Sequence, residues 1–515
     1  MQKKLFFIII LLPTILGAHQ QNSAPHNFFE KILNQANTHF HTQEFDQALT
    51  CYKKALEIQP SSVESMLKIA QILEKKNEPQ KAIIYYKKIV ALAPKFTYGF
   101  LKLAKLHHIL KHYHEALAYY KKVDMLKPND TAIIFRIASI QNALGKCKKA
   151  AKNFLKIAKI EPKNISALYN TGYSLKVMGA IDMAIELYDQ VLKIKPDYDL
   201  ALYAKALALL YKGDFERGWP LYSLRLIKEK RNAPKLRNYI KNNQLKDKII
   251  FLTPEGGFGD TIQFIRYAEK LHKKGAIVIV AERKPLIKLL ANCPYIDKLI
   301  STGKRPNFFH DYASIMSLPA IFESKEEDIP KQVPYLFPDK KLEKKWRKHF
   351  ENNNAFKIGL CWEADLKNDK SRLACAHRSI PLEKFEKLSH IPNIEFYSLQ
   401  KSTGSDQIKI LPDHFKVKTF GPDFDNSAGP FMDTAAIMNQ LDLVITVDTS
   451  VAHLAGALGI PVWVTLPYNT DWRWIAGRKD SPWYPTMRLF KQKEALNWDH
   501  VVDNIYYELK QRVGS

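Results

Sequence analysis

The segment at 442–466, DLVITVDTSVAHLAGALGIPVWVTL, holds groups that are suited to binding an anion. Residues 443–447 form a continuous apolar run, which predicts a strand buried on both faces, and residues 452–458 predict a short helix. The polar residues between them are typical of a helix N-terminus, where free N–H groups and the helix dipole stabilise negative charge. We therefore expect a nucleotide diphosphate to bind at this turn. The backbone donors would be the N–H groups of Thr449, Ser450 and Val451.

A glycine-rich turn earlier in the chain, PEGGFGD at 254–260, is the second group of residues that could take part in chemistry. It follows an apolar strand predicted at 248–253 and precedes a predicted amphipathic helix. Glycine lets the backbone approach a ligand closely, so Gly257 and Gly259 are candidate positions for binding the nucleotide ligand. The glycines do not have the spacing of the dinucleotide-binding fingerprint, and the turn alone is weak evidence. Asp260 could cap the next helix or act as a general base.

Strand and helix patterns alternate in two series in the second half of the chain, which predicts two Rossmann-like lobes. The first series starts at residue 248 and runs to about residue 338. The second series starts with IGLCW at 358–362 and continues through IEFYSLQ at 394–400 and the anion-binding segment. Because parallel strands present their carboxyl ends at one edge of a sheet, we expect the two turns to face each other across a cleft.

The first half of the chain repeats with a period of 34 residues. Prolines recur at 60, 94, 128, 162 and 196, and aromatic and small residues keep the same interval. The period and the residue types are typical of tetratricopeptide repeats, in which small residues let paired helices approach and aromatic residues fill the gap. We predict about six repeats over 29–232, stacked into an α superhelix whose concave face suits extended partners. The repeated residues are expected to form the core and not a site.

The sixth repeat ends differently from the others, with GDFERGWPLYSLR at 213–225. In it, Gly218-Trp219-Pro220 replaces the alanine-centred pattern of the other second helices. This change predicts a capping or docking unit that joins the repeats to the next domain. The polar and basic stretch at 232–243 marks the expected boundary.

The chain has 515 residues and a formal net charge of +26, most of which lies in its first half. Its length and its 46% apolar content predict more than one well-packed domain. The basic half could attract lipopolysaccharide, acidic proteins or nucleic acid, or it could be a solvated lysine-rich surface. No nucleic-acid motif accompanies the charge, so we expect no nucleic-acid partner. The five cysteines are scattered without a CxxC pair, which predicts neither a disulfide framework nor a metal site.

Residues 1–18 resemble a secretory signal, with lysines near the start, an apolar run at 5–16 and Gly17-Ala18 for cleavage. The run is short for a bilayer span and contains Pro13. The segment is therefore a signal peptide, a retained membrane anchor or a dispensable apolar tail. The first two place the protein at the cell envelope, whereas a nucleotide-diphosphate ligand made in the cytosol would require the body of the protein on the cytosolic side.

Several ordered motifs in residues 248–510 resemble glycosyltransferase family 9, the heptosyltransferase-like group with the GT-B architecture. They are GGFGD with the following TIQFIRYA, HRSIPLEKF at 377–385, FYSLQ at 396–400, DTSVAHLAGALGIPVWV at 448–464 and DWRWIAGRKDSPWYPTMRLF at 471–490. The resemblance is greatest to members that carry an amino-terminal tetratricopeptide array. It implies a GT-B fold in three parts. These are an acceptor-side lobe at 245–338, a nucleotide-sugar lobe at 355–498, and a C-terminal helix at 499–512 that packs back on the first lobe.

The resemblance also implies a role for each matching residue. Asp260 matches the family's proposed general base, which takes a proton from the acceptor hydroxyl in a single inverting displacement. Arg378 lies where family members place a basic phosphate-binding residue, often lysine. Asp448 and His453 match a donor-contacting pair, and Gln400 ends a strand at the cleft edge, where it would contact the nucleoside or the sugar. The family works without a metal ion, so cationic groups and helix dipoles must stabilise the leaving diphosphate, and no further cofactor is expected.

Structural roles are the alternatives for three of these residues. Asp260 would be a helix cap, Arg378 an exposed loop arginine, and His453 a buried histidine that steadies its turn. Ser450 stands where heptosyltransferases commonly have glycine. The lipopolysaccharide-specific enzymes generally lack the repeats, so ADP-heptose is not assigned as the donor. Three tryptophans in the last motif either stack on a sugar or base or pack inside the protein: Trp472, Trp474 and Trp483.

We therefore expect a glycosyltransferase of hexosyl or heptosyl type, inverting and metal-independent. It would move a sugar from a nucleotide-diphosphate donor to a protein or glycan acceptor that the repeats recruit. Membrane association would occur through the apolar N-terminal segment. The alternative is a non-catalytic adaptor in which the repeats bind a partner and a vestigial GT-B domain retains only its fold.

Overall fold

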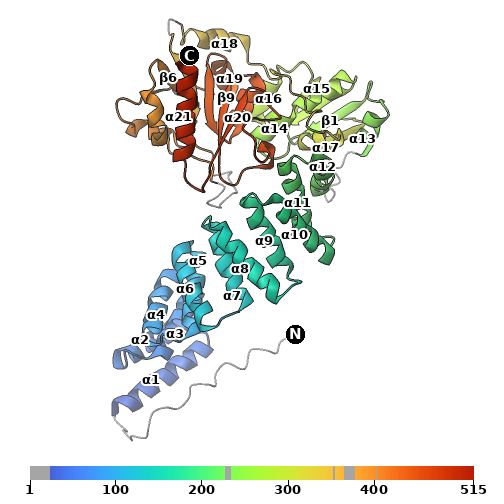
Figure 1. The fold of residues 1–515 in the computed structure, drawn as a ribbon. Helices are drawn as coiled ribbons and strands as arrows, with labels where there is room; N and C mark the ends of the chain where they lie inside the picture. The colour runs from blue at the N-terminus through green and yellow to red at the C-terminus, as the bar shows by residue number, and fades with distance from the viewer. Residues whose placement is uncertain (1–23, 227–233, 352–353, 365–376, 402, 515) are drawn as a thin grey trace. The chain divides into compact units, whose positions relative to one another are not determined.

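The computed structural model describes residues 24–226, 234–351, 354–364, 377–401 and 403–514 (Figure 1). The signal-like segment predicted at 1–18 lies outside these ranges. Contacts divide the chain into two compact units, which meet in the sequence at residues 133 and 134 and are described separately. Within the described ranges, no helix combines the length and the apolar character needed to cross a bilayer.

Twelve consecutive helices make up the described chain from Ala24 to Ser223, as six successive pairs. The first unit contains α1 (Ala24–His41), α2 (Phe45–Ile58), α3 (Val63–Lys75), α4 (Pro79–Leu92), α5 (Thr97–Ile109) and α6 (Tyr113–Leu126). The array continues with α7 (Thr131–Ala143), α8 (Cys147–Ile160), α9 (Ile165–Val177), α10 (Ile181–Ile194), α11 (Asp199–Lys212) and α12 (Phe215–Ser223). The helical repeat array predicted from the period is confirmed.

The aromatic residues of the period form the core between the paired helices. Tyr52, Tyr86 and Tyr188 each expose at most 1% of their surface. Gly172 shows why small residues recur opposite them, because a Cβ at this position would lie 2.8 Å from the ring of Tyr188. The predicted core role of these residues is confirmed.

The second unit also contains an α/β region with two parallel sheets. The first sheet has the order β3-β2-β1-β4, with β1 (Ile249–Thr253), β2 (Ile277–Glu282), β3 (Lys298–Ser301) and β4 (Asp311–Ser314). Its neighbouring helices are α13 (Pro234–Lys241), α14 (Phe258–Phe264), α15 (Arg266–Lys273), α16 (Lys284–Leu290) and α17 (Leu318–Ile321).

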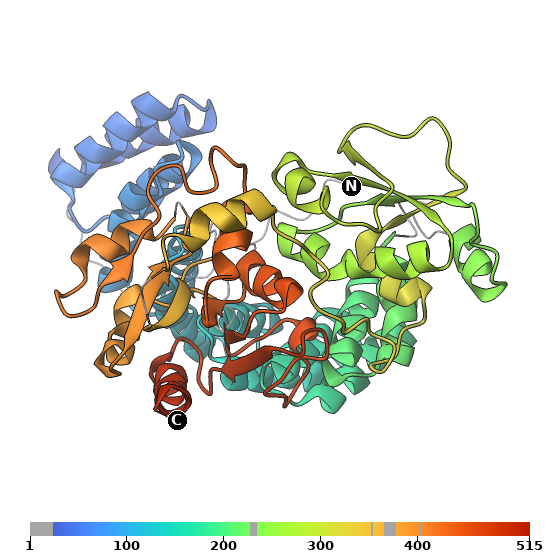
Figure 2. The same cartoon turned by 90° about the horizontal axis from the view of Figure 1, so that it is seen from above.

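The second sheet has six strands in the order β10-β9-β8-β5-β6-β7. The strands are β5 (Phe356–Cys361), β6 (Ile394–Ser398), β7 (Val417–Lys418), β8 (Leu443–Val447), β9 (Val462–Leu466) and β10 (Met487–Lys491). The helices are α18 (Lys340–Arg347), α19 (Met432–Met438), α20 (Ser450–Leu458) and α21 (Asp499–Val513). Figure 2 shows the green and yellow first half of this region beside the orange and red second half.

Both sheets reverse their strand order beside the predicted site. The order of the second sheet is that of a doubly wound dinucleotide-binding fold, and the reversal lies between β5 and β8. In the first sheet, the corresponding reversal lies between β1 and β4. Ligands of open α/β sheets bind outside the carboxyl ends of the strands at such a reversal. The strands therefore place the turns after β1 and β8 where a ligand site is expected.

The C-terminal helix α21 packs on the second sheet and not on the first lobe, so the packing predicted for 499–512 is wrong. Val501, Ile505 and Leu509 belong to the same buried cluster as Ile358 and Leu443 of the second sheet. The chain leaves β10 at the edge of this sheet. A short connection then brings α21 back against the same sheet, where its apolar stripe is buried.

The end of the repeat array is built into the α/β region. Trp219 is 3% exposed, and its indole N–H donates to the carbonyl of Ser324 at 2.8 Å. Its ring packs edge-on against Trp472, with 5.4 Å between the ring centroids. Arg225 forms a bidentate ion pair with Glu255 at 2.8 and 2.9 Å, and Glu255 belongs to the glycine-rich turn. The docking role predicted for the end of the sixth repeat is confirmed.

The fifth repeat also contacts the second half of the α/β region. Lys176 in α9 donates to the side chain of Asn469 at 3.1 Å and to the carbonyl of Thr470 at 3.4 Å. The Tyr211 hydroxyl accepts hydrogen bonds from Thr470 at 2.9 Å and from Lys491 at 2.7 Å. The segment that follows β9 is therefore held against the last two repeats.

Candidate functional site

The glycine-rich turn after β1 is closed by Asp260. Its Oδ2 accepts a hydrogen bond from the N–H of Gly257 at 2.5 Å, so Asp260 does cap the start of α14. Gly256 has φ +73°, and a Cβ there would lie 2.2 Å from the same oxygen, so this position requires glycine. Arg283 donates to the carbonyls of Gly256 at 2.8 Å and of Gly257 at 2.9 Å. Hydrogen bonds to both its N–H and its carbonyl groups thus hold the backbone of the turn.

The second carboxylate oxygen of Asp260 reaches the second half of the α/β region. Arg473 donates to it at 2.5 Å, and the same guanidinium donates to Asp471 at 2.7 Å. The Arg473 side chain is only 10% exposed. Burial disfavours its charge, but the carboxylates of Asp471 and Asp260 outweigh burial and raise the pKa of Arg473 above its ordinary value. A charged arginine therefore faces Asp260, and the helix cap and the ion pair with Arg473 use different oxygens of its carboxylate.

The turn after β8 presents free backbone donors. Thr449 lies in extended conformation at the start of α20 and makes no side-chain cap. Among the described residues, the N–H groups of Ser450 and Val451 have no hydrogen-bond partner. Unpaired N–H groups at a helix start attract an anion. This is the arrangement predicted for a diphosphate.

Asp448 and Arg378 are brought together beside this turn. Arg378 donates from Nη1 to the backbone carbonyl of Asp448 at 2.9 Å. Asp448 is 7% exposed, and burial raises the pKa of its carboxyl, with Arg378 acting in the opposite direction and Asp471 adding to the rise. Arg378 is part-buried and attached to the second sheet, so the structure does not support the exposed loop arginine.

His453 is buried in the first turn of α20. Its Nδ1 shares a hydrogen bond with the Tyr484 hydroxyl at 3.0 Å, and its ring stacks on Trp474 with 5.4 Å between centroids. Burial, with the nearby charges of Arg473 and Arg266, lowers the pKa of His453 to about 3. The imidazole is therefore neutral at physiological pH.

The two turns meet at Gly259. A Cβ on Gly259 would lie 2.8 Å from Cδ2 of His453 and 3.5 Å from Cα of Ser450. Helix α14 consequently packs directly on α20, which brings Asp260 of α14 beside the turn that follows β8. The structure thus joins the two sequence motifs that were expected to face each other.

Gln400 differs from the other predicted site residues because its amide is engaged within the protein. Its Oε1 accepts from the backbone N–H groups of Trp362 at 3.1 Å and of Glu363 at 3.0 Å. Its Nε2 donates to the carbonyls of Glu363 at 3.0 Å and of Thr403 at 2.9 Å. Gln400 therefore fixes the turn that follows β5, at the strand-order reversal.

Arginines that sequence reasoning missed hold this site together. Besides Arg283 and Arg473, Arg266 is 1% exposed and donates to the Tyr335 hydroxyl at 2.6 Å and to the carbonyl of Pro330 at 3.0 Å. It also donates to the carbonyl of Trp483, which connects α15 with the second half of the region. The sequence offered one signal for these arginines, which is that they occur within apolar motifs.

The tryptophans of the last motif pack inside the protein. Trp472, Trp474 and Trp483 expose 3%, 1% and 0% of their surfaces. Of the two readings of these residues, packing is confirmed.

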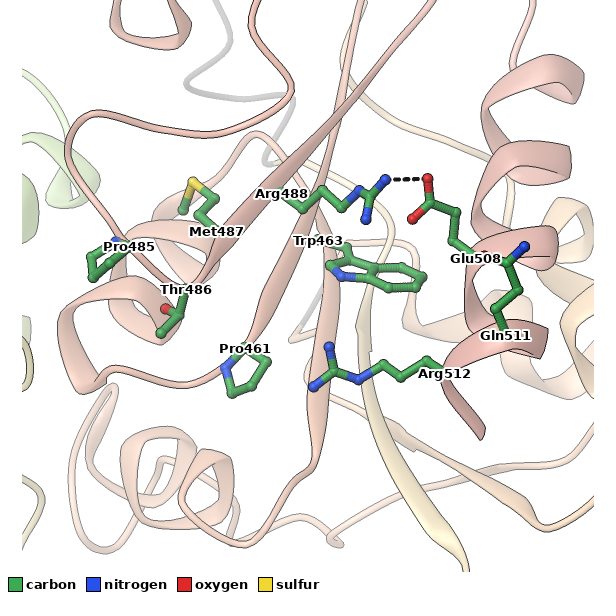
Figure 3. A pocket seen from close by; sticks show the side chains of 9 residues that line it. All are labelled: Pro461, Trp463, Pro485, Thr486, Met487, Arg488, Glu508, Gln511 and Arg512. Atoms are coloured by element: carbon green, nitrogen blue, oxygen red, sulfur yellow. Dashed lines mark hydrogen bonds and ion pairs between the residues drawn. The ribbon is translucent and has the colours of Figure 1, made fainter. Parts of the chain in front are cut away.

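Two surface cavities lie on the second half of the α/β region. The larger, of about 570 Å³, is shown in Figure 3 and lies at the amino ends of β9 and β10, where Arg488 is paired with Glu508. The candidate site follows the carboxyl ends of the strands, so this cavity is separate from it. A smaller cavity of about 400 Å³ lies near the end of β5 and is lined by Glu363, His377 and Gln407 among others.

Comparisons with known proteins identify the helical array. Models of the tetratricopeptide repeat match residues 29–95, 99–130 and 165–198. The array consists of tetratricopeptide repeats. Such repeats are protein-interaction scaffolds.

A curated relative and several solved structures are similar to the chain. Protein FlbA of Caulobacter vibrioides is 24% identical over 332 residues, which are 59% of this chain and 54% of FlbA. The match thus spans about half the length of that relative. The structure of YrrB, a TPR protein with an unusual peptide-binding site, is 25% identical, with coverage of 36% of this chain and 99% of YrrB and a TM-score of 0.32. The MamA protein is 20% identical, with coverage of 33% and 93% and a TM-score of 0.30.

Proposed function

We propose that residues 245–510 form a GT-B domain similar to glycosyltransferase family 9, which transfers a sugar from a nucleotide-diphosphate donor. The observation that carries this proposal is the meeting of the two strand-end turns at Gly259 and His453. It brings a carboxylate, two arginines and free helix N–H groups to the carboxyl edges of two parallel sheets. These are the groups that an inverting, metal-independent transfer needs.

The diphosphate would bind the N–H groups of Ser450 and Val451, with Arg378 and Arg473 as the cations that compensate its charge. As the bond between the sugar's anomeric carbon and the diphosphate breaks, the nucleoside diphosphate keeps the electron pair. These positive groups stabilise the charge that it gains. The acceptor oxygen forms its bond on the opposite face of the sugar.

Asp260 would accept the proton that the acceptor hydroxyl loses. The oxygen available for this step is Oδ1, since Oδ2 holds the N–H of Gly257. Arg473 occupies Oδ1 in this structure, and its exchange towards the diphosphate would free the base when the donor binds. The repeats supply the surface that recruits a protein partner, and we assign the acceptor to a protein or a glycan carried by that partner.

A direct test uses thermal stability in the presence of ADP, UDP, GDP and their sugars. One nucleotide should raise Tm, because a ligand that binds only the folded protein stabilises it by mass action. His453→Ala should abolish the shift, whereas Arg488→Ala at the cavity in Figure 3 should retain it. A lack of any nucleotide-specific shift in the unmodified protein would refute the donor site.

The catalytic step needs a second measurement. Asp260→Asn should leave the nucleotide-dependent shift in place and abolish sugar transfer to any acceptor found for the unmodified protein. Undiminished transfer would remove the assignment of the base.

The non-catalytic adaptor is the alternative, and one observation favours it. Both carboxylate oxygens of Asp260 are engaged, and α14 packs on α20 without a side chain at Gly259 between them. An adaptor would show partner binding by the repeats, no nucleotide-dependent shift and no change in either property on Asp260→Asn.

A further inference from the structure

Helix α8, the second helix of the fourth repeat, carries a charge distribution unlike that of its neighbours. It contains no acidic residue, and its five lysines are all exposed: Lys148, Lys149, Lys152, Lys156 and Lys159. With 100° per residue, they lie on one face, opposite the buried Ala150, Phe154 and Ile157. One side of α8 belongs to the repeat core and the other is uniformly basic.

The repeat fold does not require these lysines. One period later, in α10, the positions of Lys148 and Lys152 are taken by Asp182 and Glu186. Like charges at a spacing of four residues repel each other and weakly destabilise a helix. The basic face therefore has a cost in stability without a gain in packing.

The charge of this face is also not compensated by neighbours. Elsewhere in the array some lysines form ion pairs, such as Lys102 with Glu74 at 2.9 Å and Lys212 with Asp182 at 2.5 Å. In the part of the chain that the structure describes, none of the five α8 lysines has an ion-pair partner. The face therefore presents the five positive charges of these lysines to the surroundings.

Two apolar side chains lie at the margins of the same face. Leu155 is 40% exposed and Ile160 is 47% exposed. A helix of 14 residues is about 21 Å long, so its cations form a short straight row. Cations with flanking apolar groups fit the headgroup region of a bilayer, where ammonium groups meet lipid phosphates and apolar groups enter the acyl boundary. The face has no aromatic side chain on which a nucleic-acid base could stack.

We propose that the lysine face of α8 binds the surface of a bilayer that contains anionic lipids. The attraction is electrostatic, acts within about 10 Å at ordinary ionic strength and is weakened by salt. Leu155 and Ile160 add a smaller apolar contribution. This surface is independent of sugar transfer and gives the repeats a membrane contact outside the N-terminal segment.

The test is sedimentation of the full-length protein with vesicles of phosphatidylcholine, alone or mixed with phosphatidylglycerol. The test variant carries Lys148→Gln, Lys152→Gln, Lys156→Gln and Lys159→Gln. A matched control removes the same charge from exposed positions of α4 and α6, with Lys87→Gln, Lys88→Gln, Lys121→Gln and Lys122→Gln. The unmodified protein and the control should prefer the mixed vesicles. The test variant should bind them at least about tenfold more weakly.

A further variant, Leu155→Ser with Ile160→Ser, should weaken binding to mixed vesicles by less than the lysine substitutions do. Residues 1–23 are the same in every variant, so any adsorption through them is common to all. The proposal is overturned if the protein binds both vesicle types equally, or if the test and control variants lose the same affinity. Binding to duplex DNA or polyglutamate without binding to mixed vesicles would assign the face to another partner and overturn it as well.

Discussion

Two glycines at the start of α14 have different physical roles. A Cβ on Gly257 would meet only Asp260, at 3.5 Å, and the backbone there has φ −86°. A Cβ on Gly259 would lie 2.8 Å from Cδ2 of His453, which is closer than side chains approach. Both were predicted as donor-binding positions on the same grounds, yet only the second lies in the contact between α14 and α20.

We expect Gly259→Ala to lower the free energy of unfolding by about 1–3 kcal/mol, because the methyl group overpacks the contact between α14 and α20. This loss would appear although alanine favours a helix more than glycine does. Gly257→Ala is the matched control and should change stability by less than about 0.5 kcal/mol. Urea denaturation followed by tryptophan fluorescence measures both, and equal losses would show that Gly259 does not set the contact.

The low pKa of His453 makes a pH-dependent prediction. A histidine in the unfolded chain has a pKa near 6.5, whereas the buried His453 has a pKa of about 3. Unfolding therefore takes up a proton below pH 6.5. The contribution of neutral His453 to stability is complete above that pH and is lost as the pH falls towards 3. At pH 5 the loss amounts to about 2 kcal/mol.

His453→Asn removes this titration and keeps a polar atom near Tyr484. The variant should be less stable than the unmodified protein at pH 7.5, because the hydrogen bond and ring packing are weakened. Its stability should then fall less between pH 7.5 and pH 5. Chemical denaturation at several pH values tests this, and an unchanged pH slope would mean that His453 is not the responsible group.

The identity of the residues after the two strands could be predicted, but their partners could not. Asp260 and the turn at 448–453 were found because their types follow an apolar run. Arg473 was missed because its pairing with Asp260 joins positions 213 residues apart. A local pattern contains no information about such a contact, which depends on how closely two sheets approach.

At the scale of elements, α12 shows how a repeat helix becomes a docking surface. Trp219 packs with Phe215, Tyr222 and Trp472, and its N–H reaches Ser324 in the first α/β lobe. One period earlier, Ile185 belongs to a buried cluster with Ala208 and Leu209 of the next repeat. Here the α/β region takes the place of a seventh repeat.

We expect Trp219→Ala to destabilise the second unit by about 3–5 kcal/mol, as for other large aromatic residues removed from a core. Trp219→Phe keeps most of the ring contacts and leaves the carbonyl of Ser324 without its donor, so its loss should be about 1–2 kcal/mol. Urea denaturation of both variants checks the order. Equal effects of the two substitutions would indicate that the ring packing contributes little.

The error over α21 is also an error at the scale of elements. Its apolar stripe was recognised, but the stripe is compatible with any apolar surface that the chain can reach. Only the positions of β10 and the second sheet select the partner of Val501 and Ile505.

At the scale of the whole molecule, the chain has two compact units whose boundary falls inside the repeat array. Repeats contact mainly their neighbours, so an array can lose structure in segments. Repeats five and six are attached to the α/β region by Lys176, Trp219 and Arg225. The array is continuous in sequence, and its last repeats belong to the same compact unit as the α/β region.

Tyr86→Ala in the first unit tests this division. Tyr86 is fully buried between α3 and α5 neighbours, so its loss should destabilise the first unit by about 3–5 kcal/mol. Hydrogen exchange measured by mass spectrometry at increasing urea should show earlier exposure of peptides from 24–126. Peptides from 356–491 should be unaffected, and their earlier exposure in this variant would show a single cooperative unit instead.

Periodic and local features of this protein follow from its residue order alone. The 34-residue spacing specifies the helical array, and the apolar runs specify the strands, because both depend on contacts between residues that are close in sequence. The ion pair of Asp260 with Arg473, the helix contact at Gly259 and the site of α21 depend on distant segments. They could be established only when the two sheets and the last repeats were placed together, since a side chain finds its partner through space and not along the chain.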